Sequence, residues 1–219
     1  MVGSSTGKFP ILFIQFARSP ILGGVKTRLT PVLSATQALS LHLKLLRHTT
    51  KRLLDSDLGA VELWFSDETD LQDISAFVDK GLYTVKFQSG ENLGQRMCAA
   101  MLSGLKQADK VVLVGSDCPS IDSNYLMAAI AGLDNRDIVL GPASDGGYVL
   151  IASKRCCPAI FLNINWGSEC VLKQTINNIE TMKWTYSLLD VLDDIDRPED
   201  LTLLDNFGIK ISDELNFSS

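Results

Sequence analysis

The sequence is poor in the residues and patterns that mark several common classes of protein. It has two histidines and five cysteines among 219 residues, and no two cysteines have the CxxC spacing of a zinc or redox motif. No apolar run is long enough to cross a bilayer, and the polar start of the chain lacks the pattern of a signal peptide. We therefore expect a cytoplasmic protein with reduced thiols, no zinc site and no membrane partner.

Positive charge is also scarce. The chain has 20 Lys and Arg against 26 Asp and Glu, which gives a formal net charge of -6 and an isoelectric point near 4.9. No basic stripe is available to neutralise a phosphate backbone, so we expect no nucleic-acid partner. An acidic chain that binds a phosphorylated ligand must do so locally, with a few placed cations or with a metal ion.

Short apolar runs alternate with longer segments of helical period. The expected strands are residues 11–17, 61–66, 84–88, 111–115, 138–142, 148–152 and 186–191. The expected helices are residues 34–54, 71–78, 93–107, 123–133, 168–179 and 198–207. This alternation predicts an α/β fold with a mostly parallel sheet covered by helices on both faces, and the Asp145-Gly146-Gly147 turn suggests one antiparallel strand. Without a linker or a repeat, we expect one domain over residues 1–219, with residues 1–8 flexible.

Ligands of such sheets bind outside the carboxyl ends of the strands, so the loops that follow strands are the places to search. The loop after the first strand carries Arg18, Gly24, Lys26 and Arg28. Glycine lets backbone N–H groups approach an anion, and the cations can hold a phosphate chain. The loop lacks the Walker A pattern, and it has a simpler interpretation as a basic surface loop whose glycines turn the chain.

A second candidate loop precedes the helix that is expected to begin near residue 93. Asn92 is a natural N-cap for that helix, which alone would explain the loop. Gly94 and Arg96 at the helix start would also suit a nucleotide base, ribose or phosphate.

Asp117 follows the most apolar strand of the sequence. A carboxylate at the end of a buried strand needs a cation or several hydrogen-bond donors. A divalent ion that bridges to phosphate oxygens would meet that need, because Mg²⁺ takes few protein ligands. The alternative is that Asp117 caps the turn at Pro119.

Two further acidic segments follow later strands. Asp145, Gly146, Gly147 and Tyr148 form either a simple turn or a close approach to a ligand, with Tyr148 lining the pocket. In the segment after residue 191, Asp194 and Asp196 alternate along an extended chain and could share a metal ion with Asp117. The competing interpretation pairs Asp196 with Glu199 as a capping-box-like helix start.

Taken in order, these segments resemble the nucleotide-diphospho-sugar transferase superfamily, which has the GT-A fold. They are similar to its small bacterial branch assigned as glycosyltransferases, itself similar to phospholactate guanylyltransferases and molybdenum-cofactor nucleotidyltransferases. The matching stretches are residues 16–20, 24–29, 93–97, 115–119, 141–148, 165–168 and 194–201. The sequence departs from the superfamily pattern at Asp117, which stands in Ser-Asp-Cys-Pro rather than in D-x-D, and at residues 17–20, which replace paired glycines.

The resemblance implies a three-layer α/β/α sandwich with a mostly parallel, mixed sheet and a bound Mg²⁺ or Mn²⁺ ion. It implies Asp117 and Asp196 as metal ligands, with Asp194 as their neighbour. The nucleotide-binding residues would be Arg18, Gly24, Lys26, Arg28, Gly94 and Arg96. The acceptor would meet Asp145, Gly146, Gly147, Tyr148 and Trp166.

The leading interpretation is a glycosyltransferase that takes a sugar from a nucleoside diphosphate and gives it to a small-molecule acceptor. The metal ion at Asp117 would neutralise the departing diphosphate, assisted by Lys26 and Arg28, and Asp145 would be the base for the acceptor hydroxyl. The alternative is a nucleotidyltransferase that couples a phosphorylated small molecule to a nucleoside triphosphate and releases pyrophosphate. A third possibility is a sugar-nucleotide binder without turnover, which the retained charged residues of the loops argue against.

Overall fold

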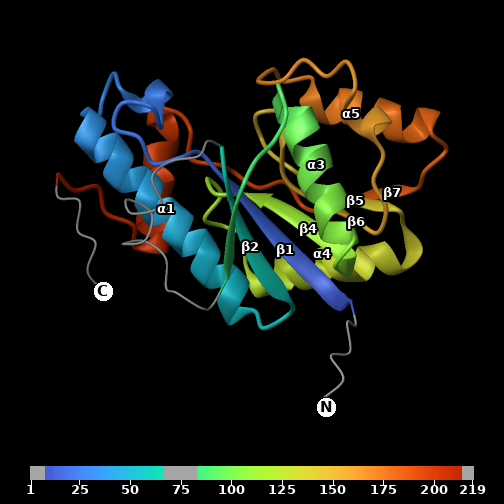
Figure 1. Ribbon diagram of the computed structural model, residues 1–219. Helices are drawn as coiled ribbons and strands as arrows, with labels where there is room; N and C mark the ends of the chain where they lie inside the picture. Colours follow the sequence, from blue (N-terminus) through green and yellow to red (C-terminus); the bar gives the residue numbers. More distant parts are fainter. Residues whose placement is uncertain (1–7, 67–82, 214–219) are drawn as a thin grey trace, which may run out of the picture.

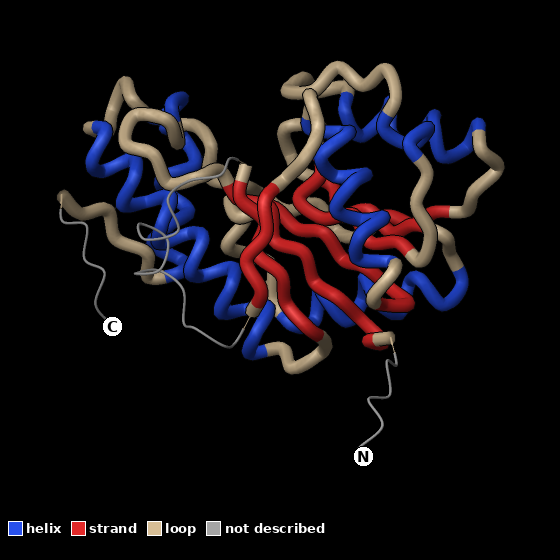
Figure 2. Tube along the Cα trace, in the orientation of Figure 1, coloured by secondary structure: helices blue, strands red, loops and turns tan. Residues whose placement is uncertain are grey.

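The computed structural model describes residues 8–66 and 83–213. The expected helix at residues 71–78 and the flexible start expected at residues 1–8, except Lys8, lie outside the described residues. Within them, seven strands form one sheet in the order β3-β2-β1-β4-β6-β5-β7. Figure 2 shows strands of this sheet side by side between helices. The strands are β1 (Phe9–Ala17), β2 (Ala60–Phe65), β3 (Thr84–Phe87), β4 (Ala108–Gly115), β5 (Ile138–Pro142), β6 (Tyr148–Ser153) and β7 (Tyr186–Leu188).

The sheet is mixed, as the sequence predicts. Strand β6 runs antiparallel to both β4 and β5, while the pairs β1–β2, β1–β4, β2–β3 and β5–β7 are parallel. The turn at Asp145-Gly146-Gly147 therefore produces the antiparallel strand that its sequence suggested. The last strand, expected over residues 186–191, has only three residues.

Helices cover both faces of the sheet (Figure 1). The α-helices are α1 (Ala35–Asp55), α3 (Leu93–Leu105), α4 (Ser123–Asn135) and α5 (Val171–Thr181), and the 3-10 helices are η1 (Thr27–Leu29), η2 (Pro158–Phe161) and η3 (Pro198–Phe207). Residues of α3, α5 and η2 share one core cluster with β1 and β4, and α4 packs in a second cluster with the opposite face. The α/β fold with helices on both faces is confirmed. In the described residues no helix has the length and apolar character needed to cross a membrane.

The helix expected over residues 198–207 is a 3-10 helix, and several of its apolar residues recur every three positions. Leu201, Leu204 and Phe207 all pack in a cluster with α1 residues such as Leu41 and Leu45. Residues three apart eclipse each other in a 3-10 helix, so this spacing presents one continuous apolar face. The packing holds η3 and the preceding segment against α1, near the end of β4.

Two helix starts follow their predicted caps. The hydroxyl of Ser34 accepts a hydrogen bond from the backbone N of Gln37, and the amide oxygen of Asn92 accepts one from the backbone N of Gln95. The Asn92 cap fixes the start of α3 beside the loop that follows β3.

Candidate functional site

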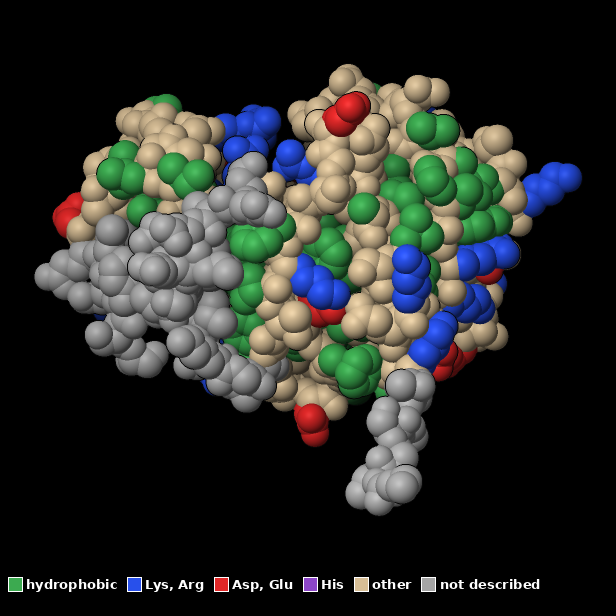
Figure 3. Space-filling model, in the orientation of Figure 1, with side chains coloured by type: hydrophobic (Ala, Val, Ile, Leu, Met, Phe, Trp, Pro, Cys, Tyr) green, Lys and Arg blue, Asp and Glu red, His purple; other side chains and the backbone are tan. Residues whose placement is uncertain are grey.

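A large cleft lies at the carboxyl ends of the central strands. Chain connections diverge between β1 and β4, which are neighbours with Phe16 opposite Gly115, and ligands of open α/β sheets bind at such a switch point. The cleft has a volume of about 690 Å³ and is lined by four basic residues, Arg18, Lys26, Arg28 and Arg96. Figure 3 shows Lys and Arg side chains gathered at a hollow in this part of the surface.

Lys26 is buried and does not extend freely into the cleft. Its ammonium lies 2.7 Å from Oδ1 of Asp117, and it also donates a hydrogen bond to the carbonyl oxygen of Ile195. The side chain is 3% exposed, and the backbone is left-handed with φ near +50°. These contacts join the loop after β1 to the end of β4 and to the acidic segment after β7. The sequence predicted an open loop cation at this position, so the burial of Lys26 corrects that expectation.

Asp117 presents its two carboxylate oxygens to different surroundings. Oδ1 is buried against Lys26 in an ion pair that lacks hydrogen-bond geometry, whereas the side chain as a whole remains 43% exposed. Burial would raise the pKa of Asp117, but the charge of Lys26, assisted by His42 and Arg18, lowers the pKa below its usual value. Asp117 is therefore ionised and keeps an oxygen open to the cleft. Among the described residues, none donates a hydrogen bond that would make the Asp117 carboxylate the cap of the turn at Pro119.

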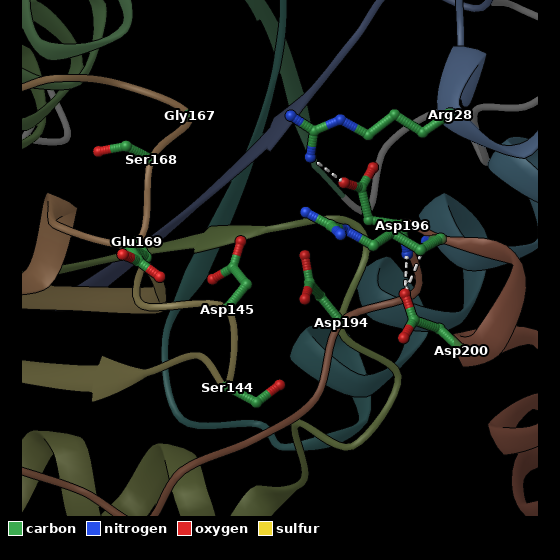
Figure 4. Close-up of a pocket in the computed structure, with 10 residues that line it drawn as sticks. Arg28, Ser144, Asp145, Gly167, Ser168, Glu169, Asp194, Asp196 and Asp200 are labelled. Carbon is green, nitrogen blue, oxygen red and sulfur yellow. Dashed lines mark hydrogen bonds and ion pairs between the residues drawn. The ribbon is translucent and has the colours of Figure 1, made fainter.

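Arg28 and Asp196 form a second ion pair at the edge of the cleft. Nη1 of Arg28 lies 2.6 Å from Oδ2 of Asp196. Figure 4 marks this ion pair with a dashed line. The capping-box interpretation of Asp196 with Glu199 is wrong, because the cap is made by Asp200. Oδ2 of Asp200 accepts hydrogen bonds from the backbone N of Asp196 at 2.9 Å and of Arg197 at 2.6 Å. Since Asp200 has this role, the carboxylate of Asp196 is available to the site.

An acidic pocket of about 520 Å³ adjoins the large cleft. It is lined by five carboxylate side chains, those of Asp145, Glu169, Asp194, Asp196 and Asp200, and by two arginines, Arg28 and Arg197. In Figure 4 the carboxylates of Asp145 and Asp194 face each other across this pocket. The acidic pocket and the large cleft share three lining residues, Arg28, Asp194 and Asp196.

Asp194 lies where the cavities of the site adjoin. It lines the large cleft, the acidic pocket and a third cavity of about 180 Å³ between Asp117 and Tyr148. Burial raises the pKa of Asp194 to about 6, with further contributions from the negative charges of Asp145, Asp117 and Asp196. Among the described residues, no Lys, Arg or His side chain forms an ion pair with Asp194.

The Asp145 loop is shaped by its glycines. Oδ1 of Asp145 accepts a hydrogen bond from the backbone N of Gly147 at 2.8 Å, which closes the turn, yet the side chain still lines two cavities. Gly146 has φ near +89°, and a Cβ there would lie 2.2 Å from the carbonyl oxygen of Glu169. This close approach holds the loop that carries Ser168 and Glu169 against the acidic pocket.

Three of the predicted ligand residues lie in packing positions. A Cβ on Gly94 would lie 2.7 Å from the ring of Trp166 and 2.9 Å from Cβ of Phe161, so the glycine is needed for packing between α3 and η2. Trp166 packs against the core cluster beneath α3. Tyr148 lines the small cavity, but its hydroxyl is buried, and burial raises its pKa. Neither Gly94 nor Trp166 lines any of the three cavities.

Two residues of the large cleft were not singled out from the sequence. His42 is buried, its Nε2 lies 2.9 Å from the carbonyl oxygen of Arg18, and burial lowers its pKa. It lies on α1 four residues after Ala38, which belongs to a core cluster. Gln88 follows β3 directly and spans three strand ends. The expected strand 84–88 included Gln88 as its last residue, and the observed strand ends one residue earlier, at Phe87, so Gln88 lies in the loop rather than in the strand.

The carboxylates of the site fit a divalent cation that arrives with a phosphorylated ligand. Within residues 8–66 and 83–213, no three His, Cys, Asp or Glu side chains are grouped closely enough to hold a metal ion alone. Mg²⁺ commonly takes one or two carboxylates and completes its shell with substrate phosphates and water. The open oxygen of Asp117 meets that requirement together with the carboxylate of Asp194, which pairs with no cation in the part of the chain that the structure describes. Asp196 lines the same cleft.

Several solved structures are similar to this chain. A protein from Desulfovibrio desulfuricans G20, described as a "putative nucleotide-diphospho-sugar transferase", is 28% identical, with a TM-score of 0.79 over 92% of this chain and 89% of that chain. The 4-diphosphocytidyl-2C-methyl-D-erythritol synthase from Anaerococcus prevotii is 14% identical, with a TM-score of 0.61 over 91% of this chain and 96% of that chain. Rv0371c from Mycobacterium tuberculosis H37Rv, solved in complex with manganese, is 14% identical, with a TM-score of 0.58 over 90% of this chain and 98% of that chain.

These similarities confirm the fold of the nucleotide-diphospho-sugar transferases and the expectation of an enzyme of the transferase class. A search of curated proteins finds no match. The sequence profile of one family matches residues 49–168, which is more than half of the chain. The protein therefore belongs to the family described as "Uncharacterized protein conserved in bacteria (DUF2064)".

Proposed function

We propose that the protein transfers a glycosyl group from a nucleoside-diphosphate sugar to a small-molecule acceptor. The donor nucleotide occupies the large cleft, and the acceptor occupies the acidic pocket. The observation that carries this proposal is the opposite charge of two adjoining cavities that share Arg28, Asp194 and Asp196. A transferase must hold its donor and its acceptor with their reacting groups next to each other. The shared residues lie at the boundary between the two cavities, where these groups would come together.

The charge of each cavity selects its ligand. The large cleft has four cationic side chains against three carboxylates. Within the described residues Arg18 and Arg96 form no ion pair, so their charges suit the diphosphate of a donor. The acidic pocket has five carboxylates against two arginines and suits a neutral, hydroxyl-rich acceptor or an amine. A phosphorylated acceptor, which a nucleotidyltransferase of the expected kind would use, would face those carboxylates. The pocket charge thus favours glycosyl transfer over nucleotidyl transfer.

The residues of the site then have distinct roles. Arg18 and Arg28 bind the diphosphate, and Arg28 is released from Asp196 when it does so. Lys26 acts by holding Asp117 in place, since its ammonium is already paired. Asp145 accepts the proton of the acceptor hydroxyl, because it lines the acidic pocket opposite Asp194.

The proposed cofactor is Mg²⁺ or Mn²⁺, held by Asp117 and Asp194 with Asp196 as a neighbour. Such an ion, when bound, neutralises the negative charge that develops on the departing diphosphate. It would also relieve the repulsion that raises the pKa of Asp194.

The test is to measure product release from two kinds of donor. Purified protein is incubated with nucleoside-diphosphate sugars and Mn²⁺ or Mg²⁺, and release of nucleoside diphosphate is followed with and without polyol and amino-sugar acceptors. We expect metal-dependent release that Arg28→Ala lowers at least tenfold. Lys51→Ala is the matched control, because Lys51 forms an exposed ion pair with Asp55 far from the cleft. Pyrophosphate release from nucleoside triphosphates, without cleavage of any nucleoside-diphosphate sugar, would overturn the proposal in favour of nucleotidyl transfer.

A further inference from the structure

The peptide group between Arg18 and Ser19 is held at both of its polar atoms by side chains from other elements. The carbonyl oxygen of Arg18 lies 2.9 Å from Nε2 of His42, a residue of α1. The backbone N of Ser19 donates a hydrogen bond of 3.2 Å to the hydroxyl oxygen of Ser66, which directly follows β2. Because a carbonyl oxygen can only accept a hydrogen bond, Nε2 of His42 carries the hydrogen. The orientation of this peptide group is therefore fixed by α1 and by the end of β2.

The chain on either side of this peptide group is held as well. The carbonyl oxygen of Ala17 accepts a hydrogen bond of 3.2 Å from Nε2 of Gln88. The carbonyl oxygen of Ser19 accepts one of 2.8 Å from the backbone N of Ile21. Pro20 further restricts the residue before it to extended conformations. Contacts within the protein thus order the start of the loop after β1.

The residue that these contacts hold has a charged side chain open to the cleft. Arg18 is exposed and lines the large cleft, and within the described residues it forms no ion pair. Ser19 and His42 are both buried. The backbone of Arg18 is therefore anchored in the interior of the protein, while its guanidinium remains available to a ligand.

Such anchoring favours the binding of an anion. An arginine on a loose loop loses conformational freedom when it binds a phosphate, and this loss weakens the binding. When the fold itself fixes the loop, the entropy is lost during folding, so less of it is lost on binding. The supporting contacts then contribute to affinity although they do not touch the ligand.

Resting on the proposed function, we infer that His42 and Ser66 are positioning residues for the diphosphate of the donor. They hold the peptide group between Arg18 and Ser19, and Arg18 binds the diphosphate. A purely structural role of His42 makes a different prediction. In that case, removal of its hydrogen bond would lower the stability of the protein without a specific loss of affinity.

The first test is a double-mutant cycle of His42 with Arg18, measured by isothermal titration calorimetry on the full-length protein. UDP, GDP, ADP and CDP are titrated with Mn²⁺ present, and the tightest ligand is used for the variants. His42→Phe keeps a ring but removes the donor, and we expect it to weaken binding about fivefold or more. In the Arg18→Ala protein the same change should alter affinity by less than about twofold, because His42 acts through Arg18.

Two further variants separate positioning from packing. His42→Gln should keep affinity within about twofold of the wild type, since its side-chain amide can donate to the carbonyl oxygen of Arg18. His48→Phe is the matched control. His48 also lies on α1, and its Nε2 lies 3.1 Å from the carbonyl oxygen of Pro119, but it lines none of the three cavities. This control should lower the unfolding temperature and leave the affinity unchanged.

Hydrogen exchange at the backbone N–H of Ser19 tests the contacts without any nucleotide. Measured by NMR, this exchange should be about tenfold faster or more in His42→Phe and in Ser66→Ala than in the wild type. It should be unchanged in His48→Phe. Unchanged exchange in His42→Phe and Ser66→Ala would overturn the inference, because other contacts would then hold the peptide group.

The affinities separate failure of this inference from failure of the proposed function. Equal affinity of His42→Phe and the wild type would overturn the inference and leave the proposed transfer standing. An equal weakening by His42→Phe in the wild type and in the Arg18→Ala protein would do the same, because His42 would not act through Arg18. Failure of every nucleoside diphosphate to bind the wild type would overturn the proposed function together with the inference.

Discussion

Lys26 lies 2.7 Å from Asp117 and bridges two segments that are far apart in the sequence, the end of β4 and the carbonyl oxygen of Ile195. A residue that the sequence presented as a phosphate ligand thus acts as an internal support of the acidic residues. This relationship changes what a substitution of Lys26 should do.

We expect Lys26→Met to destabilise the protein by about 2 kcal/mol. Removal of one partner from a buried ion pair costs about 3 to 5 kcal/mol, and the value is lower here because the Asp117 side chain is 43% exposed. Urea unfolding of the ligand-free protein measures this effect. Lys51→Met, which breaks an exposed pair with Asp55, should change stability by less than about 0.5 kcal/mol. Equal stability of Lys26→Met and the wild type, with weaker nucleotide binding, would instead identify Lys26 as a free ligand.

The location of the site could be predicted from the sequence, because it follows from strand order along the chain. Arg18 comes after the first strand and Asp117 after the most apolar one, and a parallel sheet brings both strand ends to one edge. The partners of the charged side chains could not be predicted in this way. The contact of Lys26 with Ile195 joins residues 169 positions apart. The left-handed backbone conformation at Lys26 could not be predicted either, because that conformation usually occurs at glycine.

The type and the capping residue of the last helix could not be predicted from the sequence either. The periodicity of residues 198–207 indicated a helix but not its type, which depends on packing of Leu204 against α1. The choice between Glu199 and Asp200 as the capping acid follows from that geometry, since a shift of one residue changes which carboxylate reaches the helix start. The roles of Gly94 and Trp166 were also set by tertiary packing, because each lies against the other.

Gly146 supports the acidic pocket, and Gly146→Ala should destabilise the protein by about 2 kcal/mol or more. The new Cβ would lie 2.2 Å from the carbonyl oxygen and 2.6 Å from Cα of Glu169, and φ near +89° disfavours any side chain. Gly208→Ala is a suitable comparison, because Gly208 has φ near +66° and no described residue beyond its chain neighbours has an atom within 4 Å of the added Cβ. Strain alone should cost that variant about 1 kcal/mol. Thermal unfolding of both variants shows which one loses more stability. A larger loss of stability in Gly208→Ala than in Gly146→Ala would contradict the close packing at Glu169.

Asp196 and Asp200 should differ in their effects on stability. Asp200→Ala removes the acceptor of two backbone N–H groups at the start of η3, and we expect a loss of about 1 to 2 kcal/mol. Asp196→Ala breaks only a partly exposed ion pair with Arg28 and should cost less than about 0.5 kcal/mol. Urea unfolding without ligand separates them. A greater loss in the Asp196 variant would restore Asp196 as the cap.

Asp194 should make the ligand-free protein less stable as the pH rises. Its pKa is raised from 3.8 to about 6 in the folded protein, so the folded state binds more protons than the unfolded state between these values. The resulting penalty is absent below about pH 4 and complete above about pH 7. Asp194→Asn should therefore match the wild type at pH 4 and exceed its stability at pH 7.5 by roughly 1 kcal/mol, a value reduced for the partial exposure of the carboxylate.

The effect of a metal ion on the stability difference between Asp194→Asn and the wild type shows whether Asp194 only repels its neighbouring carboxylates or also binds the cation. At pH 7.5, Mn²⁺ with a nucleoside diphosphate should stabilise the wild type by RT ln(1 + [L]/Kd) and the Asp194→Asn variant much less, so that the order of stability reverses. Asp193→Asn is the neighbouring control, because Asp193 is exposed and lines none of the three cavities. The stability of Asp193→Asn should equal that of the wild type both with and without Mn²⁺ and nucleoside diphosphate. A gain in Asp194→Asn that is the same at pH 4 and pH 7.5 would show that the carboxylates do not repel one another. An unchanged order after ligand is added would remove Asp194 from the set of metal ligands and leave Asp117 to bind the ion with the substrate phosphates.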